Sequence, residues 1–217
     1  MINFIHTADI HLGLANHGKI DKQTGVNSRI HDVLSAIDYM IEYIQSEKVS
    51  YLFIAGDVFH TRIPTVYAQI EFAKRLNLLS KEIKGVYILL GNHDVSQLIE
   101  KPAVLEIIEK LQLPNLHIIR EYQQYLDSDK NLLFVGPYVS EQDFHSYMKK
   151  LEEERNSEVP TLVFCHPMIQ GSVLSSGIEC DTIHDHWSSK CFDQYKWVNY
   201  FGLGHIHNHQ VISKSPP

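Results

Sequence analysis

The chain has 217 residues, 44% hydrophobic and 21% charged, and its formal net charge at pH 7 is −7. This composition is typical of a globular protein with one substantial core, so we expect a single domain over residues 1–217. No run approaches the roughly 20 apolar residues that cross a bilayer, and the first residues lack the pattern of a signal peptide. We therefore expect an intracellular protein of the cytoplasm or nucleoid, with no membrane partner.

The negative net charge argues against a protein that binds nucleic acid with its whole surface, because non-specific affinity for DNA comes mainly from Lys and Arg. Divalent cations held by the carboxylates would weaken this objection, since they place positive charge where a phosphate has to lie. The cysteines Cys165, Cys180 and Cys191 are widely spaced and form no CxxC pair. They predict neither a disulfide framework nor a thiolate zinc site.

Apolar runs alternate with helical patterns through the first half of the chain. In chain order, the spacing predicts a strand at residues 2–8, a helix that contains Leu34 and Ile44 and ends near Lys48, a strand at 51–55, a helix at 66–79 and a strand at 86–90.

The second half continues in the same way, except that the Ser- and His-rich residues 171–190 predict a long loop. The expected elements are a helix at 104–111, strands at 116–119 and 132–135, a surface helix at 141–155 and strands at 161–165 and 198–203. This alternation predicts an α/β layered fold with a central mixed β-sheet core flanked by helices.

Polar side chains cluster directly after five of the predicted strands. Because ligands bind outside the carboxyl ends of the strands in α/β sheets, we expect these five segments to converge on one edge. They carry Asp9 and His11, then Asp57 and His60, then Asn92, His93 and Asp94, then His166, and finally His205 and His207.

Carboxylate, imidazole and amide donors without thiolates suit intermediate divalent metals such as manganese, iron or zinc. The Asp-x-His and His-x-His pairs can each approach one centre together, because side chains alternate along extended backbone. Seven candidate ligands are too many for one tetrahedral zinc ion, but they fit two ions that share a carboxylate. They are Asp9, His11, Asp57, Asn92, His166, His205 and His207.

These clusters resemble the motifs of the calcineurin-like metallophosphoesterases, which run D-x-H, G-D-x-x-[DH], G-N-H-[DE], a lone H and G-H-x-H. In this chain the motifs begin at Asp9, Gly56, Gly91, His166 and Gly204, in that order. The surrounding sequence, from residue 3 to about residue 212, is most similar to the SbcD-type nuclease subunits of double-strand-break repair complexes. The resemblance implies a metallophosphoesterase fold and two divalent metal ions, manganese first, with magnesium, iron or zinc as alternatives.

The resemblance also implies a role for each residue. One ion would be held by Asp9, His11, Asp57 and His207, and the other by Asp57, Asn92, His166 and His205, so that Asp57 bridges them.

Three further residues match active-site positions of the family. His93 would be the catalytic acid that assists departure of the leaving oxygen, which suits a side chain with a pKa near neutrality. Asp94 would orient His93 by accepting a ring N–H, and His60 would touch the substrate phosphate.

The function that follows is a metal-dependent DNA exonuclease or endonuclease in recombination, repair or end processing. The family would also imply an ATPase partner of SbcC type and a homodimer. Its chains continue past the last motif into a cap domain, so we expect residues 1–217 to be a nuclease domain without the C-terminal cap, either a fragment or a minimal natural version.

Two alternatives remain open. The first is a phosphoesterase for another substrate, such as a cyclic nucleotide or a phosphoprotein. Protein phosphatases of this superfamily carry Asp-Arg-Gly where this chain has His60-Thr61-Arg62, a difference that favours the nuclease. The second is a catalytically silent scaffold protein, which would not need His93 beside the ligands.

Overall fold

The computed structural model describes residues 2–95, 103–180 and 186–212, and its strands form two four-stranded sheets. All neighbours are parallel in the first sheet, whose strands lie in the order β1 (Phe4–Thr7), β2 (Tyr51–Ala55), β3 (Gly85–Leu89) and β4 (Leu116–Ile119). The second sheet is mixed, because its first strand runs antiparallel to the second. Its order is β5 (Tyr122–Leu126), β6 (Asn131–Val135), β7 (Thr161–Cys165) and β8 (Tyr200–Leu203).

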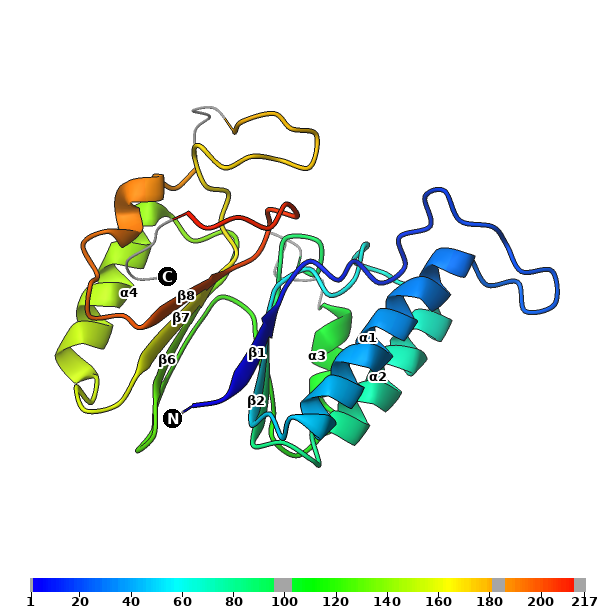
Figure 1. Cartoon of the computed structure of the whole chain (residues 1–217), viewed down its shortest axis with the longest axis horizontal. Helices are drawn as coiled ribbons and strands as arrows, with labels where there is room; N and C mark the ends of the chain where they lie inside the picture. The colour runs from blue at the N-terminus through cyan, green and yellow to red at the C-terminus, as the bar shows by residue number, and fades with distance from the viewer. Residues whose placement is uncertain (1, 96–102, 181–185, 213–217) are drawn as a thin grey trace.

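Helices cover the outer face of each sheet, so that the molecule has four layers (Figure 1). The helices α1 (Ser28–Ser46), α2 (Val66–Leu79) and α3 (Val104–Glu109) lie on the side of the first sheet. On the side of the second sheet lie α4 (Glu141–Glu154) and the short 3₁₀ helix η1 (Ser189–Phe192). Among the described residues, no helix is long and apolar enough to cross a membrane.

Side-chain caps define where the three longest helices begin. The side chain of Asn27 accepts a hydrogen bond from the amide of Arg29 at the start of α1. Thr65 and Ser140 cap α2 and α4 in the same way. Each cap satisfies one of the backbone N–H groups that the first turn of a helix leaves without a partner.

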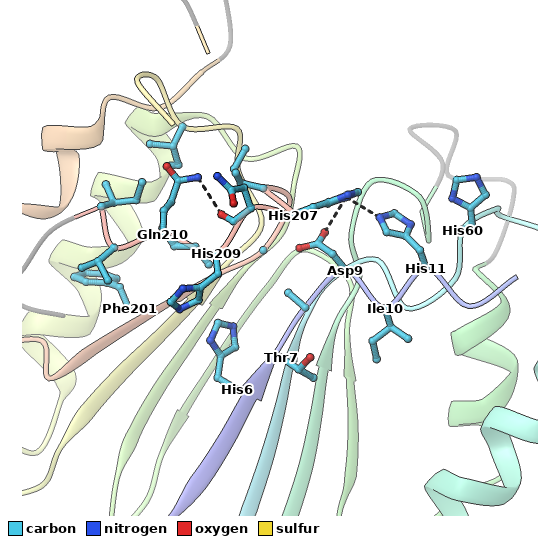
Figure 2. Close-up of a pocket in the computed structure, with 18 of the residues that line it drawn as sticks. His6, Thr7, Asp9, Ile10, His11, His60, Phe201, His207, His209 and Gln210 are labelled. Carbon is cyan, nitrogen blue, oxygen red and sulfur yellow. Dashed lines mark hydrogen bonds and ion pairs between the residues drawn. The ribbon is translucent and has the colours of Figure 1, made fainter. Parts of the chain in front are cut away.

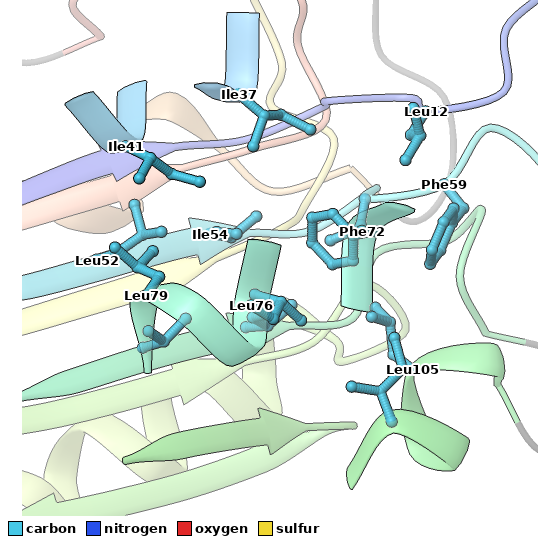
Figure 3. Close-up of a cluster of buried hydrophobic side chains, with 14 of the residues drawn as sticks. Leu12, Ile37, Ile41, Leu52, Ile54, Phe59, Phe72, Leu76, Leu79 and Leu105 are labelled. Atoms are coloured by element: carbon cyan, nitrogen blue, oxygen red, sulfur yellow. The ribbon is translucent and has the colours of Figure 1, made fainter. Parts of the chain in front are cut away.

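The central strands are apolar on both faces because one face meets helices and the other meets the second sheet. In β2, Leu52 and Ile54 pack against the helices in a core shown in Figure 3, whereas Tyr51 and Phe53 face the other sheet. The ring of Phe53 stacks on that of Phe164 in β7, with centroids 4.3 Å apart. Burying a side chain of this size stabilises the fold by about 1.5–3 kcal/mol, so this aromatic layer holds the sheets together.

The predicted α/β layered class is confirmed, with two sheets forming the core in place of one central sheet. Strand β5 was not predicted, because its sequence YQQYL is polar at its centre and it lies at the edge of its sheet, half exposed. Helix α3 ends at Glu109, two residues before the predicted end at 111. The predicted loop 171–190 has no strand or helix among its described residues until η1 begins at Ser189, and residues 181–185 lie outside the described part.

Candidate metal centre

The predicted ligands lie in the loops that follow five strands, at one end of both sheets. Strands β1, β2 and β3 of the first sheet and β7 and β8 of the second all lead into these loops. The structure therefore brings together residues that are far apart in the sequence, such as His11 and His207, which are 196 positions apart.

The backbone in these loops takes conformations that non-glycine residues rarely adopt. Asp9, His11, Asp57 and His205 have φ angles of 54°, 47°, 53° and 79°. Each such residue costs on the order of 1–3 kcal/mol and persists only where its surroundings impose it. Here the amides of Asp9 and His11 donate to the carbonyls of Gly56 and Asp57, both at 3.0 Å. These two bonds hold the loop after β1 beside the loop after β2.

The first group of candidate ligands consists of Asp9, His11 and His207. The two Nε2 atoms of His11 and His207 face each other at 2.9 Å, and Nε2 of His207 lies 3.9 Å from Oδ1 of Asp9 (Figure 2). Between two such nitrogens only one can donate a proton, whereas a cation that lies to one side of the pair would be bound by both lone pairs.

The second group consists of Asp57, His166 and His205, with the amide of Asn92 beside it. Oδ1 of Asn92 lies 2.8 Å from Nδ1 of His205 and 3.2 Å from Nε2 of His166. Oδ2 of Asp57 lies 3.4 Å from Nε2 of His166 and 3.7 Å from Nε2 of His11 in the first group. The carboxylate of Asp57 therefore lies between the two groups.

Backbone groups orient these side chains. Nδ1 of His166 lies 2.6 Å from the carbonyl oxygen of Ala55, which can only accept, so Nδ1 donates to it and Nε2 is the nitrogen turned toward Asp57 and Asn92. The amide of His205 donates to both carboxylate oxygens of Asp9 at 3.0 Å. A Cβ atom at Gly91 would collide with the carboxylate of Asp57, so only glycine fits there.

Burial controls the charge of several ligands. It lowers the pKa of His11 and of His205 to about 4, so both rings are neutral at pH 7 with a lone pair available. Burial also raises the pKa of Asp9. Burial would likewise raise the pKa of Asp57, but its contacts with His166 and with the amide of His93 hold that pKa below the ordinary carboxyl range.

These features fit two divalent cations. The donors are oxygen and nitrogen, and the two histidines of the first group turn their Nε2 atoms toward each other. One carboxylate, that of Asp57, is within reach of both groups. Such a set suits Mn²⁺, Fe²⁺ or Zn²⁺ and leaves the choice among them open.

His93 and His60 lie next to the first group. Nδ1 of His93 lies 2.7 Å from the backbone carbonyl oxygen of His60, and the two rings stack with centroids 5.4 Å apart. Nδ1 of His60 is buried and has no hydrogen-bond partner among the described residues. His11, His60 and His93 together form a third cluster of nitrogens, which the motif spacing did not indicate.

The expected contact between Asp94 and the ring of His93 is wrong. The carboxylate of Asp94 accepts instead from the amides of Val58, Phe59 and Gly91, at 3.0–3.1 Å. The acceptor for the His93 ring is the main-chain carbonyl of His60, and a backbone acceptor leaves no signal in the sequence. The carbonyl of Ala55 beside His166 was missed for the same reason.

A cavity of about 800 Å³ lies beside the first ligand group, between the edge strands β1 and β8. Asp9, His11, His60 and His207 line one part of it, and apolar side chains such as Phe201 line the rest (Figure 2). Of the described residues, those of the second group do not line it. The cavity therefore adjoins the site on one side only.

Comparison with known proteins gives a consistent family match. The family model for calcineurin-like phosphoesterases matches residues 2–210. The metallophosphoesterase YhaO of Bacillus subtilis is 27% identical over 229 residues, covering 100% of this chain and 51% of the relative.

Two relatives with shorter matches are named as DNA-processing proteins. The SbcD component of the nuclease SbcCD of Bacillus subtilis is 30% identical over 94 residues, which are 43% of this chain and 22% of that protein. The DNA double-strand break repair protein Mre11 of Archaeoglobus fulgidus is 24% identical over 138 residues, 55% of this chain and 30% of that protein. The chain thus spans about half or less of the length of each of these relatives.

Proposed function

This chain belongs to the calcineurin-like phosphoesterases, a family of hydrolases with a dinuclear metal site, and we propose that it hydrolyses phosphodiester bonds in DNA. The observation that carries the proposal is the pair of ligand groups on either side of Asp57. In this arrangement, one ion would be held by Asp9, His11, Asp57 and His207, and the other by Asp57, Asn92, His166 and His205.

Two bound divalent ions, for which manganese is the first choice, would polarise the phosphate. They would also lower the pKa of a bound water molecule toward neutrality. The protein's own residues prepare the site for them. Neutral His11 and His205 present lone pairs, and the donation from His166 to the carbonyl of Ala55 fixes the direction of its ring. The loops are locked together before any substrate binds, so little rearrangement is needed.

His93 is the proposed general acid. Because its Nδ1 is engaged with the carbonyl of His60, Nε2 is the nitrogen that remains to protonate the leaving oxygen. The ring of His60 lies beside it and lines the cavity, where it would donate to a phosphate oxygen.

Two observations support DNA as the substrate. The relatives SbcD and Mre11 are named for nuclease and DNA repair functions. In addition, His60 stands where the protein phosphatases of the superfamily carry an aspartate. The net charge of −7 offers little attraction to DNA, so we also propose a partner that supplies basic surface, an ATPase of SbcC type, and assembly as a homodimer.

Hydrolysis assays test the proposal. The substrates are labelled single- and double-stranded DNA and bis(p-nitrophenyl) phosphate. Each is incubated with the wild-type protein, His93→Ala or Asp57→Ala, in the presence of manganese, magnesium or chelator. Manganese-dependent DNA cleavage that both variants lose supports the nuclease. Turnover of the small ester without DNA cleavage favours another phosphoester, such as a cyclic nucleotide or phosphoprotein, and the absence of both activities favours a scaffold.

A further inference from the structure

Asp94 is a buried carboxylate, 4% exposed, that touches only backbone donors among the described residues. It accepts from the amides of Val58 and Phe59 at 3.1 Å and from the amide of Gly91 at 3.0 Å. The first two amides belong to the loop after β2, and the third belongs to the loop after β3. One side chain therefore ties together the two loops that carry Asp57 and His93.

A second bond ties the same loops in the opposite direction. The amide of His93 donates to Oδ1 of Asp57 at 2.9 Å. The loop after β2 thus donates two amides to Asp94, and the loop after β3 donates one amide to Asp57. Hydrogen bonds to an ionised carboxylate are stronger than those between neutral groups, so these bonds determine the relative position of the two loops.

The contact between the loops continues to the ring of His93. Phe59, whose amide Asp94 holds, is followed directly by His60, whose carbonyl accepts from Nδ1 of His93 at 2.7 Å. We propose that Asp94 is a positioning residue that orients the catalytic ring of His93 through the backbone of residues 58–60. This inference rests on the proposed role of His93 as the acid.

The substitution Asp94→Asn separates this role from simple space filling. Asparagine has nearly the same shape, but its amide group offers one oxygen and turns an N–H₂ toward donors that need acceptors. The backbone at residues 58–60 would shift, and with it the carbonyl of His60. A displacement of about 1 Å of a catalytic group can cost on the order of a hundredfold in rate.

A double-mutant cycle tests whether Asp94 acts through His93. Hydrolysis of thymidylyl-thymidine, whose leaving group needs an acid, is compared with that of bis(p-nitrophenyl) phosphate, whose leaving group does not. Asp94→Asn is expected to lower kcat on the dinucleotide by about 10–100-fold, to lower it less on the activated ester and to cost nothing further in a His93→Ala background. Equal losses on both substrates, or the same loss with and without His93, would overturn the proposal.

A spectroscopic measurement tests the orientation of the His93 ring independently of any activity. It therefore decides the proposal even if the protein cleaves no DNA. In ¹⁵N-labelled protein, wild-type His93 is expected to carry a proton on Nδ1, with a resonance protected by the bond to His60. Asp94→Asn should lose that resonance and speed amide exchange at Val58 and Phe59. An unchanged His93 resonance would contradict the inference.

Asp21→Asn is the matched control, because Asp21 also accepts from three donors, in Gln23 and Thr24, but is exposed. It should change neither kcat nor the His93 resonance. Amide exchange in β6 reports whether each variant is folded. If Asp94→Asn does not fold, Asp94→Glu, which keeps the carboxylate but lengthens it, takes its place in the same cycle.

Discussion

At the scale of single residues, burial determines which histidines are neutral, and His6 shows this away from the candidate ligands. It lies in β1, its Nδ1 lies 2.9 Å from the hydroxyl of Tyr200, and its buried Nε2 has no partner among the described residues. Burial lowers its pKa from 6.5 to about 4. The folded protein therefore holds this ring neutral at a pH where the unfolded chain already binds a proton.

This difference predicts acid sensitivity. Stability from neutral His6 is fully present above pH 6.5 and is lost as the pH falls toward about 4. His6→Phe keeps an aromatic ring beside Phe164 and removes the titration. Between pH 7 and pH 5, we expect the free energy of unfolding in urea to fall by about 1–2 kcal/mol less in the variant than in wild type. Parallel pH profiles would contradict the assignment.

At the scale of secondary-structure elements, the layer between the two sheets positions the site. Each ligand group takes residues from both sheets: Asp9 and His11 from the first with His207 from the second, and Asp57 from the first with His166 and His205 from the second. The distance between the sheets therefore determines whether each group can close around an ion. That distance is maintained by stacked rings such as Phe53 and Phe164.

Phe53→Ala tests this layer. The side chain is fully buried, so its loss is expected to cost about 3–5 kcal/mol in free energy of unfolding and to weaken manganese binding. Tyr39→Ala is the control, because Tyr39 is 70% exposed and should change stability by about 0.5 kcal/mol or less. Chemical denaturation and manganese titration measure both effects, and unaltered manganese affinity in a folded Phe53→Ala would refute the link between layer and site.

Gly202 in β8 tests the same layer from the other side. A Cβ atom there would lie 2.5 Å from Cδ1 of Phe164, too close for the ring to stay in place. Gly202→Ala is expected to lower the free energy of unfolding by about 1–3 kcal/mol. Adding Phe164→Ala, which removes the clashing Cδ1 and Cε1 atoms, should make the alanine at position 202 nearly harmless in that background. Additive losses in the double variant would show that the clash lies elsewhere.

At the scale of the whole molecule, bound ions should act as cross-links between the sheets, because both groups bridge them. Binding to the folded state alone stabilises a protein by about 2.7 kcal/mol at a hundredfold excess over Kd. We expect manganese to raise Tm and chelator to lower it. Asp57→Ala should abolish the effect of manganese on Tm, while Asp21→Asn should retain it. If manganese does not change the Tm of the wild-type protein, the metal centre is refuted.

Much of the fold could be predicted from local sequence because burial leaves a direct signal. Strands such as β2 and β7 are uninterrupted apolar runs, and their observed bounds, Tyr51–Ala55 and Thr161–Cys165, are those predicted. The clusters of Asp, His and Asn after the strands indicated where ligands would lie, since the carboxyl ends of neighbouring parallel strands share an edge. The amino-acid sequence alone therefore determined the α/β class, the family and the identity of the candidate ligands.

Only the tertiary structure decided how these parts are arranged. A strand buried on both faces has the same sequence pattern whether helices or a second sheet cover it, so the division into two sheets could not be read from apolar runs. The edge strand β5 buries too little surface to have a clear pattern. Asp94 accepts from backbone amides, and the carbonyls of Ala55 and His60 orient the rings of His166 and His93. The sequence could not indicate these contacts, because backbone groups are identical at every position and only folding determines which of them meet.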